Sequence, residues 1–152
     1  MNDLNSLLSL NDPVINERIN SLVDSQNHIK IGEWALFDTD HSGCATDKKN
    51  ASNRGESTGS EISYAREYGI MENGISDWPQ ATLMHELQHA YDYDKGRMAG
   101  EVGIPPSATD PAEIRAVQME NRVRNNVNPG HLRTTYNYEE IDFPKGKKIA
   151  DK

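Results

Sequence analysis

The segment TLMHELQHAY, residues 82–91, constrains this chain more than any other feature. His85 and His89 stand four residues apart, so on a helix their side chains differ in direction by only about 40° and can bind one cation together. Glu86 lies about 100° round from His85, where its carboxylate can reach a water at that cation without being a ligand. The apolar residues of the segment cluster on the opposite face: Leu83, Leu87, Ala90 and Tyr91. The pattern therefore predicts a helix that packs one face on the core and presents two histidines on the other.

Two histidines and a carboxylate around zinc leave a fourth position for water, and this is the arrangement of a catalytic site. The metal would lower the pKa of that water and polarise a scissile carbonyl, while Glu86 takes the proton and delivers it to the leaving amine. A peptide or amide bond is the natural substrate. The same five-residue pattern also arises by chance in ordinary surface helices. The prediction of a catalytic zinc site therefore depends also on the segments downstream of it.

Two residues are candidates for the carboxylate ligand, Glu113 and Glu120. They stand seven residues apart on one face of a helix predicted from Pro111 to about Asn125. Asp110 to Glu113 also reads as a capping box, in which Glu113 would fold back to the backbone of Asp110. If Glu113 binds the metal, Glu120 could, with Asn121 and Arg124, orient a ligand histidine or hold the later segment that contains Arg133 and Tyr136.

Composition narrows the remaining function classes. The 152 residues fit one domain, residues 1–152, with a formal net charge of −8 and a mean hydropathy of −0.81. An acidic surface disfavours nucleic acid and anionic membranes as partners. The single cysteine, Cys44, excludes an intrachain disulfide and a cysteine-based zinc cluster. We expect no membrane span and no cleaved secretory signal, so export would use another route.

The rest of the chain predicts a mixed set of short elements. Asp12-Pro13 begins a helix that runs to about Ser25, the helix at the histidines runs from Pro79 to about Asp94, and three segments read as extended: residues 28–37, 61–65 and 132–143. Residues 38–60 are polar and read as a long loop or hairpin. The tail at 145–152 reads as a flexible end.

A calcium site is a weaker alternative for the start of the polar segment. Residues 38–43, DTDHSG, place Asp38, Asp40 and Ser42 at alternating positions, as in the first half of a calcium loop. The twelfth position is Lys49, where such a loop needs a bidentate glutamate. We therefore expect a plain turn here.

The segments LMHELQHAYD, DPAEIRAVQMENRVR and LRTTYNY together resemble the bacterial effector metallopeptidases of the NleD type and related toxin domains of polymorphic or type VI secreted proteins. The match covers roughly residues 59–138. More distantly, the chain is similar to clostridial neurotoxin light chains, where the histidine helix is followed by Glu-x-Arg and later by Arg-x-x-Tyr. Glu113 and Arg115, then Arg133 and Tyr136, fit those patterns.

The resemblance implies an α+β, zincin-like (gluzincin) fold, in which a small mixed sheet has an edge strand at 61–65 beside the active-site helix and a second helix carries the third ligand. Substrate would add to that edge as a further strand. The resemblance favours Glu113 as the third ligand, with Tyr136 and Arg133 near the zinc to stabilise the oxyanion. The alternative is that Tyr136 simply alternates with Tyr138 along a strand.

The sequence thus predicts a zinc endopeptidase with one zinc per chain, held by His85, His89 and Glu113. It would be a monomeric secreted effector or toxin domain that cuts a protein or peptide of a host or competitor cell, with a secretion carrier or immunity protein as a further partner. The alternatives are a catalytically inactive zinc-binding module and a zinc amidase acting on cell-wall peptide. A structural zinc site needs no general base and usually has four protein ligands, so the presence of Glu86 argues against the inactive zinc-binding module.

Overall fold

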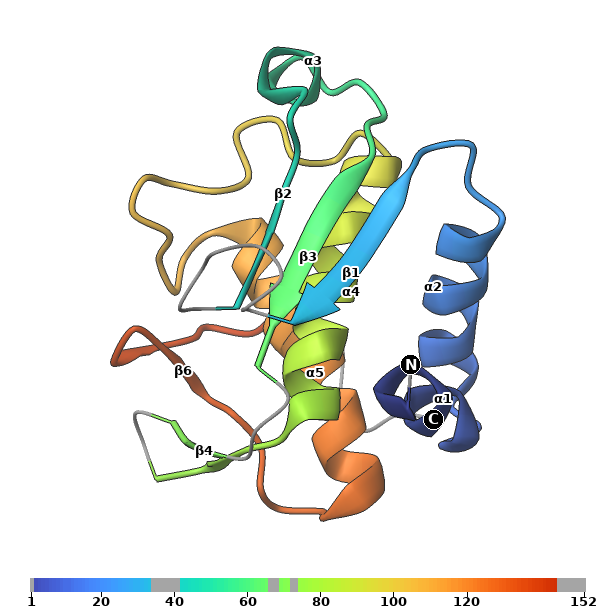
Figure 1. Ribbon diagram of the computed structural model, residues 1–152. Helices are drawn as coiled ribbons and strands as arrows, with labels where there is room; N and C mark the ends of the chain where they lie inside the picture. The colour runs from blue at the N-terminus through green and yellow to red at the C-terminus, as the bar shows by residue number, and fades with distance from the viewer. Residues whose placement is uncertain (1, 34–41, 66–68, 72–73, 145–152) are drawn as a thin grey trace.

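The computed structural model describes residues 2–33, 42–65, 69–71 and 74–144, and the elements in these ranges form an α+β fold (Figure 1). The helices and strands follow one another as α1 (Asn2–Ser9), α2 (Pro13–Val23), β1 (Ile29–Glu33), β2 (Gly43–Ala45), α3 (Lys49–Asn53), β3 (Ser60–Tyr64), β4 (Gly69–Ile70), β5 (Ser76–Asp77), α4 (Pro79–Asp94), α5 (Pro111–Val127), β6 (Thr135–Tyr136) and β7 (Glu139–Glu140). Among the described helices, none combines the length and hydropathy that a membrane crossing requires. The predicted fold class is confirmed.

The main sheet is mixed and has the strand order β1-β3-β2. β1 runs parallel to β3, with Ile31 opposite Ile62, and β2 runs antiparallel to β3, with Cys44 opposite the same residue. β3 is therefore the central strand, and the prediction that residues 61–65 form the edge is wrong. Both sides of β3 are already paired, so substrate cannot add there. The prediction failed because it did not include β2, which pairs with the second side of β3. The three small residues of β2 show no alternation of apolar and polar side chains that would indicate a strand.

The helix that carries the two histidines, α4, packs behind the main sheet (Figure 1) and is covered on its other sides by α1, α2 and α5. Every residue from Leu83 to Asp92 is buried. The face of α4 that presents the two histidines is also buried, because α5 lies against it. The main core combines this helix with the sheet and the first two helices: Leu7, Ile15, Ile19, Leu22, Ile62, Tyr64, Ala81, Leu83, Met84, Leu87, Ala90, Tyr91, Met119 and Val123.

The ends of α4 and α5 follow from local sequence. α4 ends before Gly96, whose φ of +65° favours glycine and whose Cβ, if present, would lie 2.3 Å from the carbonyl oxygen of Gly55. α5 begins after Asp110, but the capping box does not form. The Asp110 carboxylate instead accepts hydrogen bonds from the backbone of Gly103 (2.9 Å) and Ser107 (2.8 Å), and this leaves Glu113 to face α4.

The structure adds detail to two other predicted segments, the polar segment read as a loop or hairpin and the extended segment at 132–143. The described part of the polar segment, residues 42–60, forms the antiparallel pair β2–β3 with α3 in its connection. Residues 132–143 form a hairpin, β6–β7, whose turn places Asn137 and Tyr138 at positive φ. Strand β1 accounts for residues 29–33 of the predicted strand. Residue 28 precedes that strand. Three other parts of the predictions lie outside the described residues: positions 34–37 of the strand, Asp38 and Asp40 of the calcium alternative, and the tail at 145–152.

The predicted N-cap of α2 is confirmed, and it also joins α2 to α5. The carboxylate of Asp12 accepts hydrogen bonds from the backbone of Val14 (2.9 Å) and Ile15 (3.1 Å). It also forms a buried ion pair with Arg122 of α5 at 2.9 Å. Burial alone would raise the pKa of Asp12, but Arg122 and the helix backbone outweigh it and lower that pKa.

We expect Asp12→Ala to lower the free energy of unfolding by about 3–4 kcal/mol, because the cap is lost and the Arg122 guanidinium is left unpaired. Asp12→Asn keeps a good cap and should cost less, about 1–2 kcal/mol. Because the folded pKa lies below the unfolded value of about 3.9, the stabilisation is complete above that pH and disappears as pH falls through the folded pKa. Denaturant unfolding at pH 7 and pH 3 checks this; an undiminished difference between wild type and Asp12→Ala at low pH would contradict it.

Candidate active site

Packing of α4 against α5 brings three potential metal ligands together. The Nε2 atoms of His85 and His89 lie 3.3 Å apart, and Oε2 of Glu113 lies 3.3 Å from the first and 3.4 Å from the second. All three residues are buried, with exposed fractions of 7%, 6% and 4%. The predicted histidine pair and the predicted acidic helix thus meet, and the group could bind a metal ion.

The spacing of these donors suits a shared cation better than hydrogen bonds between them. N–H···O hydrogen bonds in proteins centre on about 2.9–3.0 Å, which is shorter than the separations here. A tetrahedral ion with ligand bonds of about 2.0–2.1 Å places its donors about 3.3–3.4 Å apart. Oε2 of Glu113 is fully buried, and no hydrogen bond to it is found among the described residues. The three donors therefore have the positions expected for one face of a four-coordinate metal site.

The second acidic candidate contacts the opposite side of the same imidazole. Oε2 of Glu120 lies 3.2 Å from Nδ1 of His85 and accepts a hydrogen bond from Nη1 of Arg133 at 3.0 Å. Its other oxygen, Oε1, pairs with Nε and Nη2 of Arg124 at 2.9 and 2.7 Å. Glu113 and Glu120 do share one face of α5, as predicted. They reach the two nitrogens of one histidine ring from different directions.

Arg124 connects this centre to the β4–β5 hairpin. Its side chain is 0% exposed, and it donates from Nη1 to the carbonyl oxygen of Ser76 (2.7 Å) and from Nη2 to the sulfur of Met71 (3.1 Å). The guanidinium also lies over the Trp78 ring, 5.5 Å from its centroid. One buried arginine therefore joins the Glu120 carboxylate to both sides of a hairpin.

The segment before the β6–β7 hairpin is also bound to α5, through the side chain of Asn121. The side-chain amide of Asn121 donates to the carbonyl oxygen of Arg133, and the Arg133 backbone donates to Asn121 Oδ1, both at 2.7 Å. Nε of Arg133 also donates to the carbonyl oxygen of Thr135 at 2.9 Å. The sequence singled out Asn121 and Arg124 as residues that could hold the later Arg–Tyr segment. Asn121 contacts that segment, whereas Arg124 contacts Glu120 and the β4–β5 hairpin.

Tyr136 lies at the site. Its ring is nearly parallel to that of His85, at an interplanar angle of 9° and a centroid distance of 6.4 Å. Arg133 lies against the Tyr136 ring, with Cζ 5.1 Å from its centroid. Burial, together with the neighbouring carboxylate of Glu113, raises the pKa of the Tyr136 hydroxyl, so it keeps its proton at neutral pH. Tyr138 occupies the turn instead of the next strand position, so simple alternation does not describe the two tyrosines.

The charges of the site perturb one another strongly. Burial opposes the charged form of His85, but the carboxylates of Glu113 and Glu120 outweigh it and raise the pKa of that imidazole to about 10. Burial would raise the pKa of the two carboxyl groups. Contacts with His85 outweigh it, so that the pKa of Glu113 is lowered and that of Glu120 falls to about 2. Glu86, 6% exposed, differs from both, because burial raises its pKa. A raised carboxyl pKa suits a group that accepts and returns a proton near neutrality.

Two neighbours of the site were not predicted. Arg115 of α5 donates to Asp92 of α4 (2.9 Å) and to Glu101 of the intervening loop (2.8 Å), and so ties the first turn of α5 to α4. The Glu-x-Arg spacing drew attention to Arg115 in the sequence, but it could not identify Asp92 and Glu101 as its partners, because they are distant in sequence.

Cys44 of β2 lies close enough to the site that burial and the charge of Glu86 raise the pKa of its thiol. A thiol with a raised pKa is a weak nucleophile at neutral pH, so Cys44 is not a candidate for the reacting group.

Comparison with known families decides the class of protein. A model of the peptidase M91 family, described as effector protein, matches residues 3–140. The chain belongs to the peptidase M91 family. Membership supports peptidase activity on a protein substrate and an effector role in host cells. Comparison with curated proteins and with solved structures gives no match.

The two glutamates should differ in their effect on stability when metal has been removed with a chelator. Glu120→Gln leaves the buried Arg124 and Arg133 without their carboxylate, and we expect a loss of about 3–5 kcal/mol of unfolding free energy. Glu113→Gln should cost about 1 kcal/mol, because its partners are histidines, which can release a proton, whereas arginine cannot. Denaturant titration of the two variants side by side measures the difference; equal losses would refute the distinction.

Proposed function

We propose that this chain is a zinc-dependent endopeptidase, acting as a secreted bacterial effector or toxin domain on a protein of a host or competitor cell. The observation that carries the proposal is the triangle of buried donors, His85, His89 and Glu113, beside Glu86 and Tyr136 in a chain of a peptidase family. Two imidazoles and one carboxylate are a ligand set that catalytic zinc sites use, with one position left for water.

Glu113 is the proposed third ligand because its carboxylate faces both Nε2 atoms, whereas Glu120 faces only the Nδ1 side of His85. The pairing of Glu120 with two arginines already neutralises its charge. Its contact with Nδ1 would fix the orientation of the His85 ring and leave Nε2 for the metal. When bound, zinc would supply Lewis-acid polarisation of the scissile carbonyl and activation of water.

Glu86 is the proposed general base and acid. It follows His85 on α4 and is not part of the donor triangle. Its carboxylate would accept a proton from the attacking water and deliver it to the leaving amine. The raised pKa caused by burial brings this carboxyl closer to the pH at which both transfers are possible.

Tyr136 is the proposed donor to the carbonyl oxygen as negative charge develops there. Its hydroxyl keeps its proton, and its ring is stacked beside His85. A preorganised donor of this kind stabilises the transition state more than the ground state. Arg133 was expected either to assist Tyr136 or to orient the carbonyl. We propose that it instead holds the Tyr136 ring, because its guanidinium contacts Glu120, the Thr135 carbonyl and that ring.

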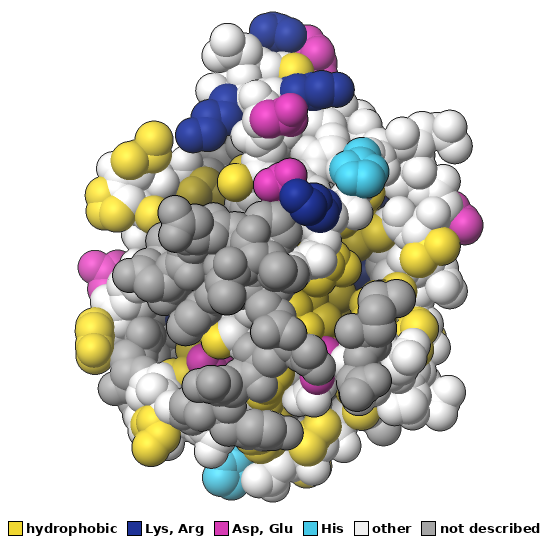
Figure 2. All heavy atoms as spheres, viewed as in Figure 1, with side chains coloured by type: hydrophobic (Ala, Val, Ile, Leu, Met, Phe, Trp, Pro, Cys, Tyr) yellow, Lys and Arg dark blue, Asp and Glu magenta, His cyan; other side chains and the backbone are white. Residues whose placement is uncertain are grey.

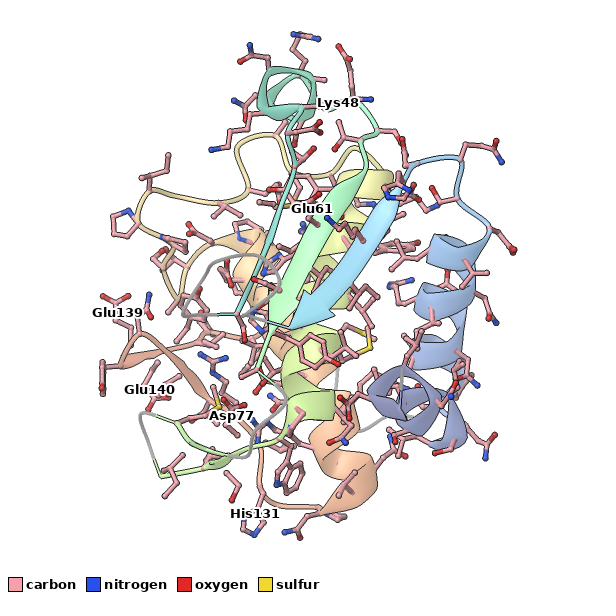
Figure 3. The ribbon with its side chains drawn as sticks, viewed as in Figure 1. Lys48, Glu61, Asp77, His131, Glu139 and Glu140 are labelled. Atoms are coloured by element: carbon pink, nitrogen blue, oxygen red, sulfur yellow. The ribbon has the colours of Figure 1, made fainter. Side chains whose placement is uncertain are left out.

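Terminal mapping of cleaved proteins in a cell lysate tests the activity, with Glu86→Gln as the inactive control. We expect about one zinc per wild-type chain, the same content in Glu86→Gln, and turnover lower by about 10²–10⁴ in that variant because glutamine cannot accept the proton. Glu61→Gln, at a solvent-exposed position of β3 (Figure 3), is the matched control and should cleave like wild type. Stoichiometric zinc in His85→Ala, or an active Glu86→Gln, would overturn the mechanism.

Tyr136→Phe should lower kcat by about 10²–10³ with little change in zinc content, because the ring remains and only the hydroxyl donor is lost. Tyr91→Phe, on the side of α4 that packs under Arg18, is the control and should leave kcat unchanged. Steady-state kinetics on a cleaved peptide from the lysate experiment, together with elemental analysis, measures both. A Tyr136→Phe enzyme with wild-type kcat would remove the hydroxyl from the mechanism.

A further inference from the structure

An ion pair between α4 and α5 lies close to the donor triangle along both helices. Nε of Arg115 on α5 donates to Oδ2 of Asp92 on α4 at 2.9 Å. Asp92 follows His89 by three residues, close to one helical turn, and Arg115 follows Glu113 by two. Each member of the pair is therefore within about 5 Å of rise from a proposed metal ligand on its own helix.

The carboxylate of this pair is fixed on both of its oxygens. Asp92 is 0% exposed. Its second oxygen, Oδ1, accepts a hydrogen bond from the side-chain amide of Gln88 at 3.0 Å, and Gln88 in turn accepts one from Nε of Arg18 on α2 at 3.2 Å. The carboxylate cannot turn away from Arg115 without leaving buried polar groups unpaired, which is costly.

The other side of the Arg115 guanidinium binds the segment that leads into α5. Nη1 donates to the carboxylate of Glu101 at 2.8 Å, and the backbone amide of Ala112 donates to the carbonyl oxygen of Glu101 at 3.3 Å. One planar guanidinium therefore fixes α4, the preceding loop and the beginning of α5 relative to one another. Glu113 follows Ala112 directly, so its place opposite α4 depends on the same contacts.

Ion pairs at the surface of this chain lack such constraints. Figure 2 shows basic and acidic side chains, dark blue and magenta, gathered at the top of the molecule, where α3 lies in Figure 1. Arg54 and Glu56 form a pair of this kind just after α3, with 62% and 53% of their side chains exposed. Water competes for both charges in an exposed pair and the side chains stay mobile, so the pair contributes little to structure.

The geometry of the donor triangle depends on how α5 lies against α4. Two of the donors, the histidines, belong to α4, and the third, Glu113, belongs to α5. A small shift at the beginning of α5 would change both distances from the carboxylate to the imidazole nitrogens, because the two histidines keep their places on one helix. Groups that hold metal ligands in position typically change metal affinity about 10- to 100-fold when they are removed.

We propose that Arg115 and Asp92 are positioning residues of the metal site, whose ion pair holds the beginning of α5 against α4 and so sets the affinity for zinc. The inference rests on the proposed zinc-dependent function and adds two residues that are not among its ligands. The pair determines how firmly the metal is held, and the chemical steps remain with Glu86 and Tyr136.

The test measures the dissociation constant of zinc by competition with a chromophoric chelator in wild type, Arg115→Gln, Asp92→Asn and two controls. Arg54→Gln removes an arginine from an exposed ion pair. Asp12→Ala breaks the buried ion pair between α2 and α5 and controls for a general loss of stability. Burial raises the pKa of Asp92 and Arg115 opposes this, so in Arg115→Gln the carboxyl can take up a proton instead of staying charged and unpaired.

We expect the zinc dissociation constant to rise about 10- to 100-fold in Arg115→Gln and in Asp92→Asn, and to stay within about twofold of wild type in both controls. The double variant should bind zinc no more weakly than the weaker single variant, because the two residues act as one pair. Cobalt in place of zinc reports the ligand geometry through its visible absorption spectrum. That spectrum should change in the two pair variants and should not change in Asp12→Ala.

Arg115→Lys is a milder variant that serves if Arg115→Gln does not fold. Lysine keeps the charge but lacks the planar fork that reaches Asp92 and Glu101 together, so we expect the zinc dissociation constant to rise about three- to tenfold. Circular dichroism of the metal-free proteins establishes which of them are folded before zinc is added.

Unchanged zinc affinity in the folded pair variants would overturn the positioning role and leave the peptidase proposal standing. A loss of affinity in Asp12→Ala as large as in the pair variants would also overturn it, because the effect would then follow stability alone. If zinc affinity depends on the pair as expected while wild type cleaves no protein in the lysate, the positioning role stands and only the proposed peptidase activity fails.

Discussion

The carboxylate of Glu120 is the charge on which the rest of this site depends. It neutralises two arginines that are almost fully buried, Arg124 and Arg133, and it contacts His85 with the same oxygen that pairs with Arg133. An unpaired guanidinium in this position would be costly, because it cannot lose its proton. Through these contacts α4, α5, the β4–β5 hairpin and the segment before β6 all meet at one side chain.

The neighbouring carboxylate of Glu113 has a different environment although it lies two turns away on the same helix. In the part of the chain that the structure describes, no arginine pairs with Glu113. Its carboxylate faces two imidazole nitrogens, and Oε2 is buried there without a hydrogen bond. One glutamate is thus held ionised by permanent cations and keeps the structure together. Glu113 has no such permanent cation among the described residues, so its carboxylate can serve as a ligand of the proposed metal ion.

The two hairpins, β4–β5 and β6–β7, make different contacts with this centre. β4–β5 is fixed from behind by Arg124, and its position follows that of Glu120. β6–β7 carries the proposed oxyanion donor, Tyr136, beside His85, and Asn137 in its turn ties the hairpin to the loop before α5.

The sequence by itself determined the elements whose signals are local. Helical spacing and caps predicted α2, α4 and α5, and the same spacing predicted that His85 could pair with His89 and that Glu113 and Glu120 would share a face. Only the tertiary structure decided the rest. It placed β3 in the centre of the sheet, buried both faces of α4, left the capping box unformed and gave the two glutamates different partners. Those outcomes depend on contacts between residues far apart in the chain, such as Glu120 with Arg133 or Gly43–Ala45 with β3, and the periodicity of a single segment carries no information about which distant segment will cover it.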